Sequence, residues 1–460
     1  MKRAKWNLVS IVIVVWLVVT ITILSSYLMN PSILSRSKNT NSISNNSISM
    51  PLSSSSSEML VANVAPFAWK FFSQMVLERP ENILVSPLSI AACLSMIWSG
   101  VTRSSQSDIE FQSLFQLPSE QSIPTLLNVL LKKESNNDNQ MLSMSNSLWT
   151  SGEVDTKYVE EVSSFASIQP LPISLDPIND WVAKETNNHI PKLFSSEDSS
   201  LDPNTLAIAI NAIHFQGLWA TPFDNTHTQP DTFTTFDDQQ TYTANFMSKT
   251  IHTSLAQDVS SLGGASVLTL DYACPDAQQQ QQCSSEESEF CAMLVLPKHN
   301  TVQSMKQVIQ GFAKQVSSSS TNNNNNNNNN KLLSDLYFPN DSRKQNVHIS
   351  LPRFELKQGP ESLKKFMKDM GFETAFSTEK NQFLRMTPNR HDTYLDDVIA
   401  AATMKVTEEG TVATASTAAI MMTRSLPPSI EFNRPFLFMV LHRPTGTPLF
   451  LSQVHNPHFI

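Results

Sequence analysis

One peptide bond in this chain is presented as a protease substrate would be, and it joins Arg424 to Ser425. The thirteen residues before it, 411–423, contain no charge, no proline and no glycine, and two prolines follow at Pro427 and Pro428. Exposed loops are normally punctuated by Gly, Asn, Asp and Pro, whereas this segment is compatible with a strand throughout. A lone arginine before a di-proline is an arrangement accessible to proteases, so the expected chemistry is cleavage of this bond.

The same segment has a second interpretation, as an ordinary central strand of a sheet. Two features count against it. The segment is longer than the usual strand of about 5–6 residues, and it ends in a lone arginine before a di-proline. We therefore predict a strand-like loop that can enter a sheet, hinged at Gly410 and ended by the two prolines.

Motifs that would make the chain an enzyme are absent. The sequence has no G-x-S-x-G, no H-E-x-x-H, no Walker loop and no G-x-G-x-x-G. We predict no enzymatic activity, no metal and no cofactor. The ten histidines are scattered, and we expect those in or beside apolar runs to be structural. They are His214, His348, His442, His455 and His458.

The four cysteines match neither a C-x-x-C zinc site nor a dense disulfide scaffold. Cys274 and Cys283 flank a glutamine run, 278–282, and a disulfide between them would close a short loop if the chain is exported. The alternative is that these two cysteines, together with Cys93 and Cys291, are free thiols. The sequence leaves both alternatives open.

The composition sets broad limits on fold and partners. A length of 460 residues suggests two or three domains at typical domain sizes, although some folds of this length form one unit. The apolar content of 40% is enough for a large core. The net charge of -9 argues against a nucleic-acid binder, which would carry a basic face.

The N-terminal residues 1–29 carry a targeting signal. An uncharged apolar stretch, 8–28, follows three basic residues, and no further charge occurs before Arg36. The stretch is about as long as a membrane-spanning helix, and the positive charges before it would keep the N-terminus in the cytosol. We expect the rest of the chain outside the cytosol. It is either tethered as a single-pass type II membrane protein or secreted after signal-peptide cleavage near Ser25.

Residues 30–57 are rich in serine and asparagine and cannot form a core, so we predict a solvated stalk before a globular part over 58–460. Sequons for N-glycosylation occur at Asn45 in the stalk and at Asn340. Two polar insertions interrupt the globular part, the glutamine run and residues 317–330. Both are predicted to be surface loops, because loop entropy rises slowly with length.

The hydrophobic pattern predicts a mixed fold, with helices mostly early and strands mostly late. Helices are expected over 61–77, 87–98, 176–193 and 361–370. Extended segments are expected over 206–215, 347–356, 436–442 and 448–454.

Several segments resemble motifs of the serpin family. Residues 407–411, TEEGT, with the small residues after them, are similar to the hinge of the serpin reactive-centre loop. Residues 432–438, FNRPFLF, resemble the C-terminal signature of the family. Further resemblances occur at 82–90, 211–219, 351–354 and 448–450. Because the motifs follow in order from about residue 59 to 460, the chain is identified as a member of this family.

The resemblance implies an α+β serpin fold, with about nine helices, three β-sheets, a dominant five-stranded sheet and an exposed reactive-centre loop. In the family the cleaved bond lies fourteen residues beyond the hinge glycine, and from Gly410 this count reaches Arg424 and Ser425. The implied hinge residues are Glu408, Glu409, Gly410, Thr411, Val412, Ala413, Thr414 and Ala415. The implied residues of the sheet-opening region are Ser86, Ser89, Asn211 and Trp219.

One position departs from the family pattern. The family usually has a histidine in the strand leading to the hinge, where it bonds to the central asparagine and serine, and the matching residue is Ala400. A buried amide that loses a hydrogen-bond partner costs about 1–3 kcal/mol unless water substitutes for it. The resemblance therefore implies that this chain controls the opening of its sheet differently.

The implied function is inhibition by a monomer that traps a trypsin-like serine protease as a covalent acyl-enzyme. Two alternatives remain: a non-inhibitory serpin acting as a chaperone, carrier or storage protein, and a membrane-tethered adhesion or receptor module. Thr411, Ala413 and Ala415 favour inhibition, because non-inhibitory members tend to lose small hinge residues. No basic helix indicates a heparin-like cofactor, since Lys132 and Lys133 form too small a cluster.

Overall fold

The computed structural model describes ten stretches of the chain, which are residues 54–78, 80–116, 142–194, 207–215, 217–238, 240–273, 288–320, 344–410, 427–443 and 446–457. Several predicted features lie outside these stretches. They are the apolar stretch 8–28, most of the stalk, Asn45, Asn340, Cys274, Cys283 and residues 411–426, which include the Arg424–Ser425 bond. Within the ten stretches, no helix has the length and apolar character needed to cross a membrane.

The described stretches contain seven α-helices. They are α2 (Ser54–Glu78), α3 (Pro87–Gly100), α4 (Gln106–Phe115), α6 (Thr156–Val162), α7 (Asp176–Glu185), α8 (Val302–Ser320) and α10 (Lys364–Asp369). Four short 3-10 helices join them, which are η1 (Asn225–His227), η2 (Phe236–Asp238), η3 (Ser260–Leu262) and η5 (Thr374–Phe376). The expected helix at 87–98 is confirmed, and every residue of α3 is buried.

Four predicted elements have different bounds. The helix expected over 61–77 begins at Ser54, within the segment predicted as a stalk, and ends at Glu78. The helix expected over 176–193 ends at Glu185, because Asn187 and Asn188 have positive φ angles of 48° and 62° and leave the helical path. The helix expected over 361–370 begins only at Lys364, because β10 (Phe354–Ser362) still occupies the residues before it. The extended segment expected over 347–356 is divided at Arg353 between β9 (Lys344–Pro352) and β10.

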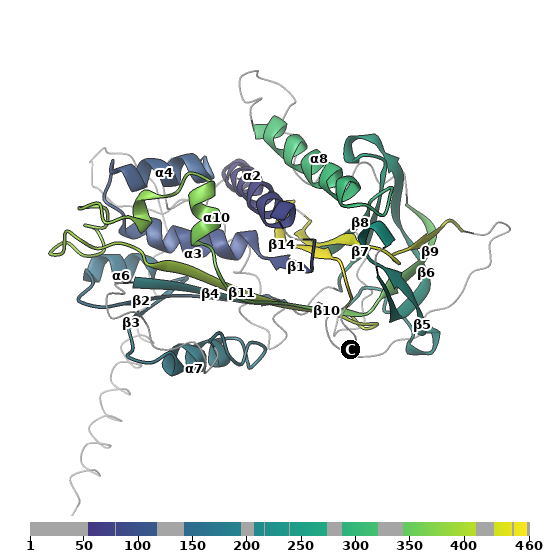
Figure 1. Ribbon diagram of the computed structural model, residues 1–460, viewed down its shortest axis with the longest axis horizontal. Helices are drawn as coiled ribbons and strands as arrows, with labels where there is room; N and C mark the ends of the chain where they lie inside the picture. Colours follow the sequence, from purple (N-terminus) through teal and green to yellow (C-terminus); the bar gives the residue numbers. More distant parts are fainter. Residues whose placement is uncertain are drawn as a thin grey trace, which may run out of the picture. The chain divides into compact units, whose positions relative to one another are not determined.

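A five-stranded sheet forms the middle layer of one half of the fold (Figure 1). Its strand order is β10, β11 (Asp397–Val406), β4 (Ala207–Phe215), β2 (Leu142–Thr150) and β3 (Ser167–Pro170). Strands β11 and β4 are parallel, whereas β10 pairs antiparallel with β11 and β2 antiparallel with β4. Figure 1 shows α7 on one face of this sheet and α3, α4 and α10 on the other.

The second sheet has nine strands. Its order is β1 (Ile83–Val85), β14 (Thr447–Val454), β13 (Phe436–His442), β8 (Phe290–Leu296), β7 (Ala265–Asp271), β6 (Thr241–Val259), β9 and β12 (Ser429–Glu431), with β5 (Gln229–Thr234) also paired to β6. The 19-residue strand β6 pairs with β9 through Ser254 and with β7 from Leu255 onward. Because one strand serves both parts, continuous pairing joins two of the three expected sheets into one.

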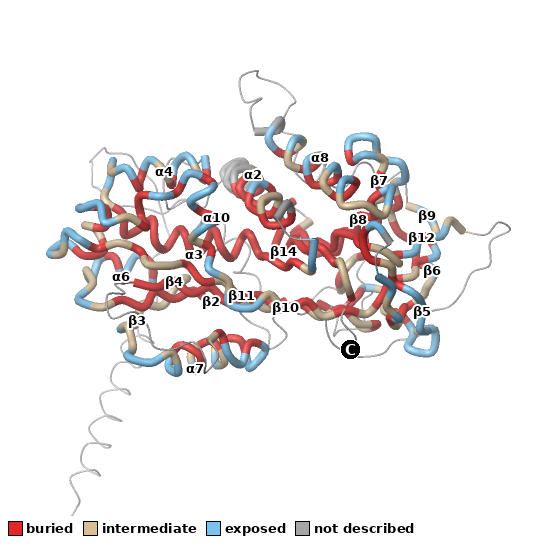
Figure 2. The backbone as a smooth tube through the Cα atoms, in the orientation of Figure 1, coloured by how far each residue is buried: buried red, intermediate tan, exposed pale blue. Residues whose placement is uncertain are grey.

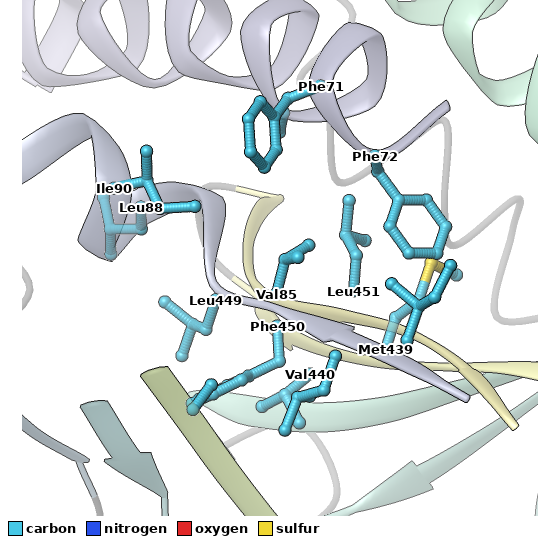
Figure 3. Close-up of a cluster of buried hydrophobic side chains, with 14 of the residues drawn as sticks. Phe71, Phe72, Val85, Leu88, Ile90, Met439, Val440, Leu449, Phe450 and Leu451 are labelled. Atoms are coloured by element: carbon cyan, nitrogen blue, oxygen red, sulfur yellow. The ribbon is translucent and has the colours of Figure 1, made fainter. Parts of the chain in front are cut away.

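The buried side chains form two clusters of different size. The larger cluster fills the space between α2, α3 and the strands β13 and β14, and Figure 3 shows part of it around Phe72, Leu451 and Met439. The smaller cluster lies between α7 and the outer face of the five-stranded sheet (Figure 2). The predicted α+β class and the five-stranded sheet are confirmed.

Candidate functional site

The parallel ladder between β4 and β11 is the first part of the candidate site, and we call it the seam. Its register runs from Asp397 opposite Ile208 to Thr403 opposite His214, with Ala400 opposite Asn211 at the centre. Alanine is frequent along it. The alanines are Ala207, Ala209 and Ala212 on β4 and Ala400, Ala401 and Ala402 on β11. Small side chains on both strands leave little interdigitation to resist separation of the two strands.

The predicted hinge leaves β11 at one end of the seam and is held there by the backbone after β4. The Trp219 amide donates to the Glu409 carbonyl oxygen at 2.9 Å, and the Phe223 amide donates to the Glu408 carbonyl oxygen at 2.7 Å. The Trp219 indole Nε1 donates to the Thr407 carbonyl oxygen at 3.0 Å. Since the indole also stacks on Tyr272 with a ring separation of 4.7 Å, Trp219 fixes the position of the hinge.

Gly410 occupies a position in this hinge that only glycine can fill. Its φ angle is +120°, and an added Cβ would lie 2.3 Å from the Gly217 carbonyl oxygen and 2.6 Å from the Trp219 nitrogen. It forms antiparallel bridges with both Leu218 and Thr407. The chain therefore reverses direction at the residue that the sequence predicts as the hinge.

Glu408 is a buried carboxylate in the same turn, with 1% of its side chain exposed. Arg353 Nε donates to Glu408 Oε2 at 2.7 Å, and the Thr228 hydroxyl donates to Glu408 Oε1. A buried carboxylate requires such partners, because an unpaired charge in the interior is strongly destabilising. The ion pair joins the start of β10 to the hinge. Sequence reasoning missed it, since 55 residues separate the two partners and no local pattern links them.

The centre of the seam holds a buried hydrogen-bond network around Asn211. Its side-chain Nδ2 donates to the Ser89 hydroxyl, to the Ser89 carbonyl oxygen at 3.2 Å and to Asn146 Oδ1 at 2.8 Å. The Ser86 hydroxyl accepts from the Ser89 amide at 3.3 Å and caps α3. None of these Asn211 acceptors lies on β11, so the network ties β4 to β2 and α3.

The alanine at position 400 therefore does not leave the buried Asn211 amide without a hydrogen-bond partner, and the expected energetic cost does not arise. The Asn146 side chain on β2 supplies an acceptor from the other neighbouring strand. The sequence analysis did not single out Asn146. A signal was present, because asparagine is depleted in strand interiors and this one lies in the middle of β2.

A cavity of about 20 Å³, enough for about one water molecule, lies beside Ala400 between α2, β1 and the five-stranded sheet. It is lined by Met75, Leu84, Val85, Ser86, Ile90, Asn211, Ile213, Gln358, Glu361, Leu363, Ala400, Ala401 and Ala402. β10 has a register shift between Gln358 and Glu361, and Gln358 Nε2 donates to Glu361 Oε2 across it at 2.6 Å. The centre of the seam is thus incompletely filled on its core side.

The predicted site residues fall into two groups. Ser86, Ser89 and Asn211 lie together at the centre of the seam, while Trp219 lies at its end with Glu408, Glu409 and Gly410. The remaining predicted residues lie outside the described stretches. They are Thr411, Val412, Ala413, Thr414, Ala415, Arg424 and Ser425.

Side chains suited to metal binding or nucleophilic chemistry do not gather in the stretches that the structure describes. No group of three or more His, Cys, Asp or Glu there could hold a metal ion. Cys93 and Cys291 are both buried free thiols, and burial raises the pKa of each to about 12. Both are thus protonated near neutral pH and are poor nucleophiles.

Comparisons with known proteins place this arrangement in context. Residues 62–457 match the family model described as "Serpin (serine protease inhibitor)". The chain is 26% identical over 415 residues to human antithrombin-III, covering 85% of this chain and 80% of the relative. It is 25% identical over 401 residues to a protein of Cyanea capillata named "Serine protease inhibitor", covering 85% and 96%. The fold is similar to human thyroxine-binding globulin in complex with thyroxine, with a TM-score of 0.69, 22% identity and coverage of 87% and 99%.

Proposed function

The chain belongs to the serpin family, and from this premise we propose that it inhibits trypsin-like serine proteases by inserting its own loop into the seam. The bond attacked is Arg424–Ser425, and the inserted segment is 411–423. Relatives named as inhibitors, such as the Cyanea capillata protein, support the general class of activity. The arginine supports the narrower target class, because a trypsin-like pocket binds a positively charged side chain.

The direction of the strands at the seam is the observation that carries the proposal. Strands β4 and β11 are parallel neighbours, and the chain turns back at Gly410 after leaving β11. A segment that continues from this turn and passes between them runs antiparallel to both. One parallel ladder is then replaced by two antiparallel ladders, which are somewhat more stable per residue.

The length of segment 411–423 fits this role. Thirteen residues in a strand extend about 43 Å at about 3.3 Å per residue. The two strands of the seam have 9 and 10 residues, so the inserted segment spans their whole length. Its side chains are uncharged throughout and small over 411–419, so they can pass between the strands and face both the core and α7.

The covalent step precedes insertion. The protease serine Oγ attacks the carbonyl carbon of Arg424, the bond to the Ser425 nitrogen breaks, and Ser425 becomes a new amino terminus. The protease is then joined to Arg424 by an ester. Insertion of 411–423 carries the ester to the far end of the sheet and distorts the protease before water can hydrolyse the ester. The inhibitor acts as a monomer in this scheme.

A non-inhibitory role is the second candidate, and one comparison favours it. The similar structure of thyroxine-binding globulin is a complex with a small ligand, so this fold also supports a carrier. The hinge of the present chain retains Thr411, Ala413 and Ala415, which favours inhibition. The cavity beside Ala400 is about 20 Å³ and is too small for a ligand of that kind.

We also propose an extracytosolic site of action, on the charge pattern around residues 8–28. Sequencing of the mature N-terminus distinguishes a tethered chain from one cleaved near Ser25. Peptide mapping without reduction tests the Cys274–Cys283 disulfide, and glycosidase treatment tests glycans at Asn45 and Asn340.

Mixing the globular part with trypsin tests the inhibitory proposal directly. We expect a covalent complex that survives boiling in detergent, and a loop-cleaved form that melts well above the intact protein. Arg424→Lys should retain the complex, while Arg424→Ala should lose it with trypsin and keep the native melting temperature. Cleavage at Arg424–Ser425 with no complex and no change in melting temperature would contradict inhibition and favour a non-inhibitory carrier.

A further inference from the structure

Two histidines stack against each other at the end of the seam nearest the hinge, on the face of the sheet that α7 covers. The rings of His189 and His214 are 3.6 Å apart between centroids and 8° from parallel. His214 is half-buried on β4, and His189 is exposed in the segment that follows α7. The contact therefore joins a surface segment to the strand that must separate from β11.

The segment that carries His189 is fixed to α7. The Thr186 hydroxyl donates to the Val182 carbonyl oxygen at 2.7 Å and accepts from the Ile190 amide at 3.1 Å. Asn179 Oδ1 accepts from the amides of Leu193 and Phe194, both at 2.9 Å. Helix α7 and the residues up to 194 therefore form one unit, which we call the α7 cover.

The α7 cover closes the outer face of the seam. Its buried side chains Val182, Ile190 and Leu193 pack in the smaller core cluster with Ile210 of β4 and Ile399 of β11. A segment inserted between the two strands would widen this face, so the cover must shift when the seam opens. Contacts between the cover and the strands therefore resist opening.

The histidine pair contacts the elements that move relative to each other when the seam opens. His214 lies directly opposite Thr403 in the seam register, and its Nδ1 is 3.4 Å from the Thr403 hydroxyl. Opening the seam separates His214 from Thr403, and a shift of the cover separates it from His189. One imidazole thus contacts both elements that must move.

We propose that His189 and His214 form a pH-sensitive clasp that holds the α7 cover on the closed seam. Two neutral rings, or one neutral and one protonated, can stack face to face. Two protonated rings at 3.6 Å repel each other. Imidazoles take up protons between about pH 8 and pH 5. The stack therefore resists opening near neutral pH, and this resistance is lost as the pH falls.

The charged groups nearest the two histidines in the chain or in strand register are mostly lysines. They are Lys405 on β11, Lys357 and Glu355 on β10, and Lys184, Glu185 and Lys192 on the α7 cover. Glu355 lies 3.0 Å from Lys357, and Glu185 lies 3.7 Å from Lys184. Each carboxylate thus has a lysine beside it, and strand β2 contributes no charged residue. Lysines outnumber carboxylates four to two among these groups, which disfavours a second positive charge in the stack.

Hydrogen exchange of the uncleaved protein tests the clasp without any protease. Backbone exchange is measured by mass spectrometry for Ala207–Phe215 and Asp397–Val406 at pH 7.5 and pH 5.5. The wild type is compared with His189→Phe at each pH, so that the intrinsic pH dependence of exchange cancels. Phenylalanine keeps a stacking ring but cannot be protonated. We expect the exchange rate of the wild type relative to the variant to rise about tenfold at pH 5.5.

Two controls define the result. His299→Phe, which changes an exposed histidine before α8, should follow the wild type at both pH values. His189→Ala, which removes the ring, should exchange faster than wild type at pH 7.5. A ratio of wild type to His189→Phe that is the same at both pH values overturns the clasp. Any effect of the clasp on protease inhibition rests on the proposed function. The exchange measurement itself does not depend on that function. A failure to trap trypsin is therefore a separate result.

Discussion

The seam between β4 and β11 and the strand pair β13 and β14 both consist of strands with a neighbour on each side, yet they are built differently. Strands β13 and β14 pair antiparallel, and every residue of both is buried. The Leu451 side chain points there toward Phe71 and Phe72 of α2 (Figure 3). The Phe450 ring lies on the other face of the strands, with its centroid 6.0 Å from that of Phe215 on β4. The seam pairs two parallel strands with an alanine in four of its seven residue pairs. It has a cavity on its core side and polar contacts at its hinge end.

The difference indicates how one chain can keep its fold while one sheet opens. Removing water from large apolar surfaces supplies most of the stability of a domain, and β13 and β14 contribute a continuous run of large side chains, Phe436 to Leu441 and Leu449 to Leu451, to the larger cluster. The seam depends more on specific hydrogen bonds, on the Glu408 ion pair and on the α7 cover. Such contacts can be broken at the seam while the pairing of β13 with β14 is kept.

The largest effect is expected from a charge placed in the inserting segment. Thr411→Arg would bury an unpaired charge when 411–423 enters the seam, at a cost of several kcal/mol. Insertion then becomes slower than hydrolysis of the acyl-enzyme. The yield of detergent-stable complex with trypsin should fall about a hundredfold or more, while cleavage at Arg424–Ser425 continues. Gel electrophoresis of the products measures both.

The matched control for this change is Thr232→Arg, since Thr232 is exposed on strand β5. This variant should form the complex as the wild type does. If Thr411→Arg gave as much detergent-stable complex as the wild type, segment 411–423 would not enter the sheet. The difference between the seam and the β13–β14 pair would then not explain inhibition.

A cavity in the packed region should lower stability and leave trapping unchanged. Leu451 is fully buried on β14, opposite Val85 and Met439. Leu451→Ala should lower the free energy of unfolding by about 2–5 kcal/mol, measured by chemical denaturation of the loop-cleaved form. The fraction of trypsin trapped by the folded protein should stay constant.

Ile173→Ala provides the comparison for Leu451, because Ile173 is 96% exposed and its truncation should change stability by less than about 0.5 kcal/mol. If Leu451→Ala reduced trapping in proportion to stability, the seam and the packed region would be a single cooperative unit.

Loss of the ion pair at the hinge should have an intermediate effect. Arg353→Ala leaves the Glu408 carboxylate buried without its cation. Arg353 is itself 30% exposed, so the expected loss is about 1–3 kcal/mol, below that of a fully buried pair. Exchange of the Asp397–Val406 amides should accelerate more than that of Phe436–His442.

Lys298→Ala is the control for the ion pair, since Lys298 and Asp258 form a pair in which both side chains are more than half exposed. Its removal should cost well under about 1 kcal/mol. Equal acceleration in both strands would show that the Arg353 pair stabilises the whole fold and does not act on the hinge.

Much of the fold could be predicted because its signals are local. Helix α3 follows from Ser86, Pro87 and an apolar run, and β4 follows from a continuous apolar segment. The end of α7 could not be predicted in the same way. The pattern remains apolar beyond Glu185 because Ile190 and Leu193 still pack on the sheet, although the chain has left the helix.

The site was only partly predictable because its contacts join distant segments. The turn at Gly410 follows from a glycine in a short motif. The partners of Glu408 and Asn211 do not, since Arg353 and Asn146 are set by sheet register. His214 was expected to be structural, and nothing in the sequence pairs it with His189.

The smallest expected effect comes from filling the cavity beside the seam. Ala400 lines the cavity and is half-buried on the core side of β11. Ala400→Val adds methyl groups there and places a β-branched residue in a strand. It should raise the free energy of unfolding of the intact protein by about 0.5–1 kcal/mol, measured by chemical denaturation.

Ala212→Val is the matched control, because Ala212 lies across the seam on β4, does not line the cavity, and packs in the cluster beneath α7, on the opposite face. Extra volume there meets well-packed side chains and should destabilise the protein by about 1–3 kcal/mol. Opposite signs at these two alanines are expected only if the free space lies on one side of the seam. Ala400→Val should also release slightly more cleaved inhibitor per protease trapped, because the closed seam gains stability that the opened seam lacks. If both variants destabilised the protein equally, the cavity would have no part in setting how easily the sheet opens.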